Sequence, residues 1–252
     1  MFCPERTGLR ANCARPPPIL TNAEPDERSA ELRRLRPRFL FDSLAGELGR
    51  KASTPSIVGH AMNSALERAV SVMSDIHAPW GVAGGCALDL FIGHESRSHA
   101  DIDIAILRAD QQQLRSQLSG RVEKVVARQL ATWLPTEILE PPVHEVHVTW
   151  PDGYCLEFLL NEQDCVTREW VFRRDGRIRR SLAATFSTDR EVPYLAPEIV
   201  LLYKAKAPSA TDDGDFHTVL SHLQADRRSW LRQALDLTAP GHRWANILSR
   251  EA

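Results

Sequence analysis

Two aspartates lie one residue apart in an apolar stretch, at Asp101 and Asp103. Their alternation with Ile102, Ile104 and Ile106 predicts a strand over 101–107, in which residues i and i+2 share a face about 6.5–7 Å apart. Two carboxylates on one face repel each other and are costly to desolvate unless a cation joins them. Such oxygen ligands suit Mg²⁺, and two ions about 3.5–4 Å apart could clamp both oxygens of an in-line displacement. The alternative is a solvated edge strand with two surface aspartates.

A pair of glycines, Gly84-Gly85, precedes these aspartates by 16 residues. The pair lies between a predicted strand over 80–84 and a predicted short helix over 86–92, which Gly93 ends. Glycines at such a junction let backbone N–H groups approach an anion, and the helix N-terminus adds its dipole. A plain tight turn is the alternative for the glycines alone. Together with the aspartates, they predict a phosphate cradle beside a metal site.

The joint pattern resembles the nucleotidyltransferase superfamily of the polymerase-beta type. Within it, the fuller string is similar to the aminoglycoside nucleotidyltransferases, especially the 2''-adenylyltransferase-like branch: Gly84-Gly85-x-Ala87-x-Asp89-Leu90, Gly93 and Arg97-x-His99-x-Asp101-Ile102-Asp103. The resemblance covers about residues 62–250, because the stretch 195–206 and Asp213-x-Asp215-Phe216 match the family's helical half. Two departures are Cys86, where that branch usually has Trp, and 210–213, which lacks the family's lysine.

The resemblance implies a third carboxylate on a neighbouring strand. Glu157 is the best candidate, because it lies in the otherwise apolar run Tyr-Cys-Leu-Glu-Phe-Leu-Leu and a buried carboxylate needs a partner. Its role would be third metal ligand, or general base for the attacking hydroxyl. Glu145 on the preceding strand is a weaker competitor. A glutamate that faces water on an edge strand is the alternative.

Cations near these carboxylates are candidates for contact with a nucleotide. Arg97 and His99 match the family string, so Arg97 could meet the triphosphate and His99 could fix the loop. A purely structural loop role remains open for both. Lys204 lies in an apolar helix, where a buried ammonium requires an anion. That anion could be Glu198 or a nucleotide phosphate. The predicted nucleotide-binding set is Gly84, Gly85, Arg97, His99 and Lys204.

Three further groups of polar residues allow two interpretations each. A cluster of arginines could touch phosphate or could form a charged hairpin surface: Arg173, Arg174, Arg177, Arg179 and Arg180. Asp212, Asp213 and Asp215 could bind a cationic substrate or could cap a helix start. His144 and His147 are three apart on a predicted strand and face opposite sides, which is poor metal geometry.

The elements that must position these residues predict an α+β fold. A helix over 62–76 and the strand over 80–84 precede the glycines, and strands over 143–150 and 154–160 are joined by the turn Pro151-Asp152-Gly153. After Pro193 the pattern becomes helical. We expect a disordered extension over 1–55, a catalytic domain with a small mixed sheet flanked by helices over 56–190, and a helical substrate-binding part over 191–252.

Composition limits the class of protein. The 252 residues are 43% hydrophobic and 25% charged, as in ordinary globular proteins, and no apolar run reaches the length of about 18 residues that spans a membrane. Five scattered cysteines without a CxxC pair suggest neither a zinc site nor a disulfide framework, which favours the cytoplasm. Residues 1–55 carry 10 Lys and Arg against 7 Asp and Glu, a net charge of +3. The remainder has 21 against 26, a net charge of −5, which makes nucleic acid an unlikely partner.

The resemblance and the residues together predict Mg²⁺-dependent transfer of a nucleoside monophosphate, AMP from ATP, to a hydroxyl of a small molecule. An aminoglycoside is a candidate acceptor, because a polycation complements the net negative charge of residues 56–252. Two alternatives remain: nucleotidyl transfer to a protein or an RNA end, and a non-catalytic nucleotide-binding or antitoxin-type protein on the same fold.

Overall fold

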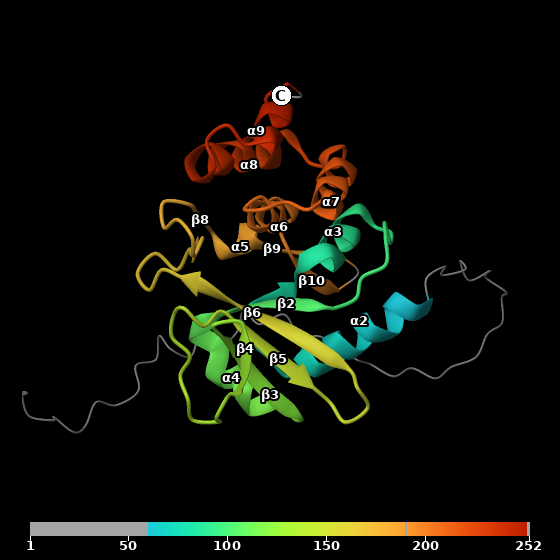
Figure 1. The fold of residues 1–252 in the computed structure, drawn as a ribbon, viewed down its shortest axis with the longest axis vertical. Coiled ribbons are helices and arrows are strands. Elements are labelled where there is room, and N and C mark those ends of the chain that lie inside the picture. Colours follow the sequence, from blue (N-terminus) through green and yellow to red (C-terminus); the bar gives the residue numbers. More distant parts are fainter. Residues whose placement is uncertain (1–59, 190, 251–252) are drawn as a thin grey trace, which may run out of the picture. The chain divides into compact units, whose positions relative to one another are not determined.

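A mixed β-sheet forms the centre of the computed structural model, which describes residues 60–189 and 191–250 (Figure 1). The extension predicted for residues 1–55 lies outside the described residues. The α+β class with a mixed sheet is confirmed.

The sheet follows the strand order β4-β3-β5-β6-β2-β1-β10-β9. Two neighbouring pairs, β2 with β6 and β1 with β10, are parallel, and the others are antiparallel. Two short strands, β7 and β8, continue from β6 as a separate antiparallel pair. The strands are β1 (Trp80–Val82), β2 (Asp103–Leu107), β3 (Arg121–Val126), β4 (Gln129–Thr132), β5 (Glu145–Thr149), β6 (Cys155–Gln163), β7 (Trp170–Val171), β8 (Arg179–Arg180), β9 (Phe186–Asp189) and β10 (Val192–Leu195).

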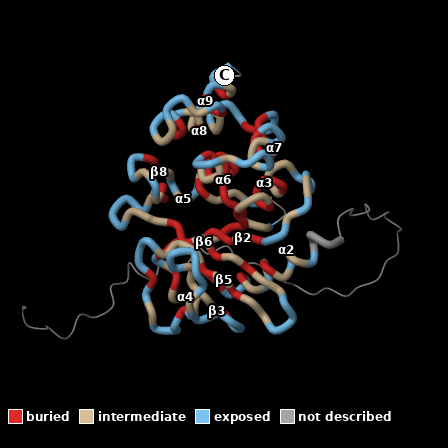
Figure 2. Tube along the Cα trace, in the orientation of Figure 1, coloured by how far each residue is buried: buried red, intermediate tan, exposed pale blue. Residues whose placement is uncertain are grey.

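The register of three central strands brings polar residues side by side. Asp103 on β2 pairs with Glu157 on β6, and Glu157 in turn pairs with His147 on β5. The adjacent pair, Ile104 with Phe158, is fully buried. Because side chains alternate along a strand, Ile104 and Phe158 lie on one face of the sheet, and Asp103, Glu157 and His147 share the other. Figure 2 shows how strongly burial concentrates along β2 and β6.

Helices pack around this sheet. They are α2 (His60–Met73), α3 (Gly84–Ile92), α4 (Gln111–Gln117), α5 (Leu182–Thr185), α6 (Pro197–Lys204), α7 (Ala210–Leu220), α8 (Ala225–Thr238) and α9 (Arg243–Leu248), with a 3₁₀ turn, η2, at Arg108–Asp110. Helix α3 contacts α6 and α7, and α8 packs on both α6 and α9. As its apolar sequence predicts, α6 is buried over its first six residues. None of the helices that the structure describes has the length and apolarity needed to cross a bilayer.

No strand was predicted for the residues of β4, β9 and β10. Strand β10 contains Pro193, which lacks an N–H donor and therefore argues against a strand. It pairs in parallel with β1, which lies more than 100 residues earlier, and antiparallel with the neighbouring β9. Strand β2 also begins two residues later than predicted, so Asp101 lies just before the strand.

A buried ion cluster joins α6 to its neighbours. The Glu198 side chain is fully buried, and its two carboxylate oxygens meet Arg180 of β8 at 2.5 Å and Arg227 of α8 at 3.0 Å. Arg180 also lies over the ring of Trp230, 4.7 Å from its centroid. The buried Glu198 carboxylate and its two guanidinium partners hold β8, α6 and α8 together. Removal of the carboxylate or of the guanidinium groups would leave the remaining charge without a partner of opposite sign.

Glu198→Gln should therefore lower the free energy of unfolding by about 3–5 kcal/mol, since it leaves two partly buried guanidinium groups without an anion. Thermal unfolding measures the change. The matched control is Asp236→Asn, which breaks the exposed α8 pair of Asp236 with Arg232 and should cost less than about 0.5 kcal/mol. Equal losses in the two variants would show that the buried cluster does not stabilise the fold.

Candidate active site

The start of α3 lies directly against the carboxylate of Asp103. Gly84, the first residue of the helix, has φ +60°, and a Cβ placed on it would lie 2.0 Å from Asp103 Oδ2. The preceding residue, Ala83, donates its N–H to the Asp103 carbonyl at 2.7 Å. Both the left-handed backbone and the close approach require glycine here. The helix N-terminus and the first candidate metal ligand are thereby held together.

Gly85 makes room for the loop that leads to the aspartates. A Cβ on Gly85 would lie 2.3 Å from His99 Cε1 and 2.7 Å from a terminal nitrogen of Arg97. The next residue, Cys86, is buried, and burial above all raises the pKa of its thiol to about 12. Cys86 therefore packs as a small neutral side chain. The glycine pair brings Asp103, Arg97 and His99 onto one helix end.

Carboxylates crowd beside this helix end. Burial, then the nearby charges of Asp101 and Glu145, raise the pKa of Asp103, although Lys204 and a hydrogen bond with Glu157 oppose the shift. Burial likewise raises the pKa of Glu157, with further increases from Asp103 and its acidic neighbours and a decrease from His147. Carboxyl groups whose ionisation is opposed by burial and by neighbouring like charges are suited to a cation. The oxygen donors match the preference of Mg²⁺.

His147 joins this cluster, which the sequence analysis did not foresee. Its Nε2 lies 2.6 Å from Glu145 Oε1 and 3.8 Å from Glu157 Oε1. One potential ligand atom from each of these three residues lies within 4.8 Å of the others, a spacing that one metal ion could bridge. The available signal was the spacing Glu145-x-His147, with Val146 and Val148 buried between and beyond them. His144, on the other side of the strand, contacts Arg108 instead, with 2.7 Å between His144 Nδ1 and a terminal guanidinium nitrogen.

The predicted nucleotide-binding cations already have acidic partners. Arg97 holds both oxygens of Asp215 at 2.8 and 3.0 Å. Lys204 Nζ lies 2.6 Å from Asp212 and 3.0 Å from Asp215. The alternative that Lys204 pairs with Glu198 is wrong, because Glu198 is occupied by Arg180 and Arg227 on other elements.

Asp212 and Asp213 serve α7 as well. Asp212 forms a reciprocal capping box with Ser209, as the helix-start interpretation predicts. Asp213 accepts hydrogen bonds from Arg243 and from the indole of Trp244 in α9. The acidic residues of α7 are thus engaged within the protein.

Asp89 anchors the loop that carries His99. Its Oδ2 lies 2.6 Å from His99 Nε2, and its Oδ1 accepts from the Ser96 backbone N–H at 3.1 Å. Burial raises the pKa of Asp89, but the hydrogen bonds from His99 and Ser96 outweigh it, so the net shift is downward. The carboxylate is ionised, and it holds His99 in place as a fixed part of the loop.

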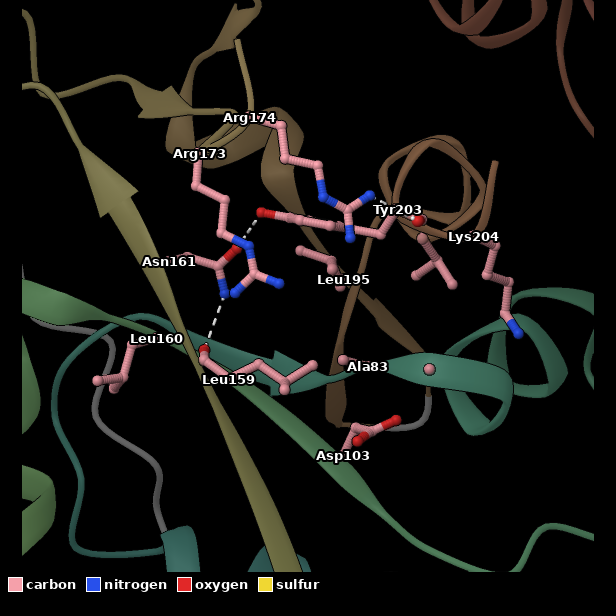
Figure 3. A pocket seen from close by; sticks show the side chains of 12 residues that line it. Ala83, Asp103, Leu159, Leu160, Asn161, Arg173, Arg174, Leu195, Tyr203 and Lys204 are labelled. Carbon is pink, nitrogen blue, oxygen red and sulfur yellow. Dashed lines mark hydrogen bonds between the residues drawn. The ribbon is translucent and has the colours of Figure 1, made fainter. Parts of the chain in front are cut away.

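A pocket of about 250 Å³ opens beside Gly84 and Asp103 (Figure 3). Its walls are largely apolar, from β6, β10 and α6, and its cationic residues are Lys204, Arg173 and Arg174. The predicted arginine cluster therefore divides in two. Three of its members have carboxylate partners: Arg177 with Asp175, Arg179 with Asp164 and Arg180 with Glu198. Arg173 and Arg174 line the pocket instead.

The contact between Gly84 and Asp103 gives a first test of this site. Gly84→Ala should distort the α3 start and abolish nucleotide-induced stabilisation in thermal unfolding, because a Cβ cannot occupy the space that Asp103 fills. Gly93→Ala is the control, since Gly93 also has positive φ, at +83°, but has no atom near its added Cβ. It should cost only the strain of about 1–2 kcal/mol and keep the ligand response. If both variants lose the nucleotide-induced stabilisation, backbone strain explains the loss, and the contact between Gly84 and Asp103 does not.

The repulsion between the carboxylates gives a second test. With EDTA present, Asp103→Asn should raise Tm above wild type, and the gain should grow as pH rises. The sign follows because the pKa of Asp103 is raised on folding, so its ionisation weakens the folded state above the ordinary pKa of about 3.9. Asp75→Asn, at an exposed position, should show no such trend. A drop in Tm for Asp103→Asn at pH 7 would contradict the repulsion.

Comparison with solved structures gives matches among nucleotidyltransferases. A lincomycin-bound lincosamide antibiotic adenylyltransferase, LnuA, is 16% identical and aligns over 64% of this chain and 97% of its own, with a TM-score of 0.46. The antibiotic-resistance factor ANT(2'')-Ia is 15% identical over 75% of this chain and 96% of its own, also at 0.46. A nucleotidyltransferase-like protein from Paracoccidioides brasiliensis is 17% identical over 74% and 93%, at 0.40. No curated protein matches the chain.

The sequence profile of one protein family matches residues 65–199, just over half of the chain. The match includes the glycine pair, both aspartates of the Asp-x-Asp motif and Glu157. The resemblance inferred from these motifs is thereby confirmed, and the protein is an enzyme of the nucleotidyltransferase type. The chain belongs to the aminoglycoside-2''-adenylyltransferase family.

Proposed function

We propose that this enzyme transfers a nucleoside monophosphate, AMP from ATP, to a hydroxyl of a small acceptor in a Mg²⁺-dependent reaction. One observation carries the proposal: the Asp103 carboxylate lies against Gly84 at the start of α3 and lines a pocket there. Glu157 pairs with Asp103 on the neighbouring strand. This contact joins an anion-binding helix end to a metal-binding carboxylate.

The donor set fits a divalent cation. Asp101, Asp103 and Glu157 would hold Mg²⁺, since the pKa values of Asp103 and Glu157 are raised by burial and by neighbouring carboxylates that a cation would neutralise. When bound, the ion supplies neutralisation of charge on the phosphates and a template for the reacting groups.

The residues around the carboxylates would position the nucleotide. The first N–H groups of a helix have no partner within the helix, so those at the start of α3 can donate to a phosphate oxygen. Lys204 and Arg97 would neutralise negative charge on the phosphates, although both form ion pairs with Asp215 in this structure. His99 would keep the loop against Gly85. Most of the catalytic effect would come from orientation and charge neutralisation.

The alternative role for Glu157, in place of a metal ligand, is general base for the acceptor hydroxyl. Its pKa is raised, which brings it closer to the pKa of an efficient base at neutral pH. His147, 3.8 Å away, could hold the orientation of the Glu157 carboxylate. The acceptor hydroxyl would then lose its proton to Glu157 Oε1 or Oε2 as its oxygen bonds to the α-phosphorus, and the bond from that phosphorus to the leaving pyrophosphate would break.

The acceptor that we propose is an aminoglycoside. The family to which the chain belongs takes its name from aminoglycoside 2''-adenylylation. Residues 56–252 carry a net charge of −5, and the exposed Asp101 lies at the edge of the site. A polycationic acceptor matches this charge.

Incubation of the protein with ATP, Mg²⁺ and a panel of kanamycin, gentamicin, tobramycin and lincomycin tests the proposal. The expected result is pyrophosphate release that depends on an acceptor, together with a product whose mass is raised by one adenylyl group. Asp103→Asn should lower the rate by at least about 10²-fold, the scale lost with one group that stabilises developing charge. Absence of any adenylylated product would remove these antibiotics as acceptors, and turnover that survives in Asp103→Asn would remove the proposed metal site.

A further inference from the structure

Arg173 and Arg174 differ from the other arginines of their hairpin. Their guanidinium carbons both lie 5.3 Å from the ring centroid of Tyr203 on α6. Arg174 also donates to the Tyr203 carbonyl oxygen at 2.9 Å. In the part of the chain that the structure describes, no carboxylate pairs with either of them, whereas Arg177 and Arg179 each have one.

The Tyr203 ring on which these two arginines stack is held rigidly. The Tyr203 hydroxyl donates to Asn161 Oδ1 at 3.3 Å, and the buried Trp170 indole donates to the same oxygen at 3.0 Å. Phe172 meets the Tyr203 ring edge-on, with 5.0 Å between centroids. The ring therefore cannot turn away, and the arginines that stack on it are arranged before any ligand binds.

Two guanidinium groups over one ring repel each other. Partial burial, and then the charge of Arg173, lower the pKa of Arg174. Such an arrangement without a counter-ion costs free energy, and an anion placed between or beside the two groups would offset that cost. A guanidinium also offers paired donors that match phosphate oxygens.

The pocket connects this pair with the active site. Its lining runs from Arg173 and Arg174 to Lys204, Gly84 and Asp103 (Figure 3). An anion that contacts the arginines can therefore continue, within one cavity, to the helix end where phosphate would bind. Asp103 is the one acidic residue of this lining, against three cationic ones, and Asp101, Glu145 and His147 lie outside it.

We infer that Arg173 and Arg174 bind the phosphate chain of the nucleoside triphosphate and complete, with Lys204, a cationic pocket reserved for the nucleotide. The inference rests on the proposed function. A cationic acceptor would be excluded from this pocket by charge and would approach Asp103 from the side of Asp101 and Glu145.

The test compares the double variant Arg173→Gln/Arg174→Gln with Arg177→Gln/Arg179→Gln. Both remove two positive charges from the same hairpin, but the second pair already has carboxylate partners. Isothermal titration with MgATP, tripolyphosphate and adenosine gives the affinities. We expect the first variant to raise Kd for MgATP and tripolyphosphate by about tenfold or more, as loss of charge-assisted hydrogen bonds implies, and to leave adenosine unchanged. The control should stay within about twofold of wild type.

Further variants and measurements separate loss of phosphate binding from misfolding and from loss of base binding. Arg173→Lys/Arg174→Lys keeps the charges and should recover part of the affinity, and circular dichroism checks that each variant is folded. In turnover assays the glutamine variant should raise KM for ATP but not for the acceptor. Unchanged MgATP affinity in a folded glutamine variant overturns the inference, as does a loss confined to adenosine, which would assign the pair to the base. If wild type itself fails to bind MgATP, the proposed function fails first.

Discussion

The mutual repulsion of carboxylates on one face of the sheet is the constraint on which the rest of the site depends. The parallel register of β2 and β6 places Asp103 beside Glu157, and the neighbouring β5 adds Glu145 and His147. The core on the opposite face, where Ile104 and Phe158 are fully buried, prevents these strands from shifting by one residue to relieve the repulsion. A divalent cation would supply the missing positive charge, and that cation could then hold a phosphate beside the carboxylates.

Cationic and acidic side chains around the carboxylate cluster lie on different elements of the fold. Asp215 joins Arg97 of the loop after α3 to Lys204 of α6, so ion pairs link this loop to α6 and α7. The largely apolar pocket that Asp103 lines contains three cationic residues, Arg173, Arg174 and Lys204, whereas Asp101, Glu145 and Glu157 lie outside its lining. A reaction between an anionic nucleotide and a cationic acceptor needs such a division, because each substrate is then repelled from the site of the other.

Sequence reasoning found the parts of the site that lie close together in the chain. The glycine pair, Asp103 and the strand with Glu157 could be predicted because the spacing and the apolar alternation are local signals. The pairing of β1 with β10 and the Arg97–Asp215 contact span more than 100 residues, so only the folded chain shows them. His147 was overlooked because its partners come from the strand register. The predicted roles of individual residues, including the metal ligands and the base, still await experiment.

Calorimetric titration of ATP into the protein, with Mg²⁺ and then with EDTA, tests the central claim most directly. The account predicts tight binding with Mg²⁺, weak binding in EDTA, and loss of this difference in Asp103→Asn, because the cation joins the carboxylate to the phosphates. ATP binding of equal strength with and without Mg²⁺, or a Mg²⁺ effect that persists in Asp103→Asn, would contradict the claim that Asp103 and its neighbours form a metal-dependent nucleotide site.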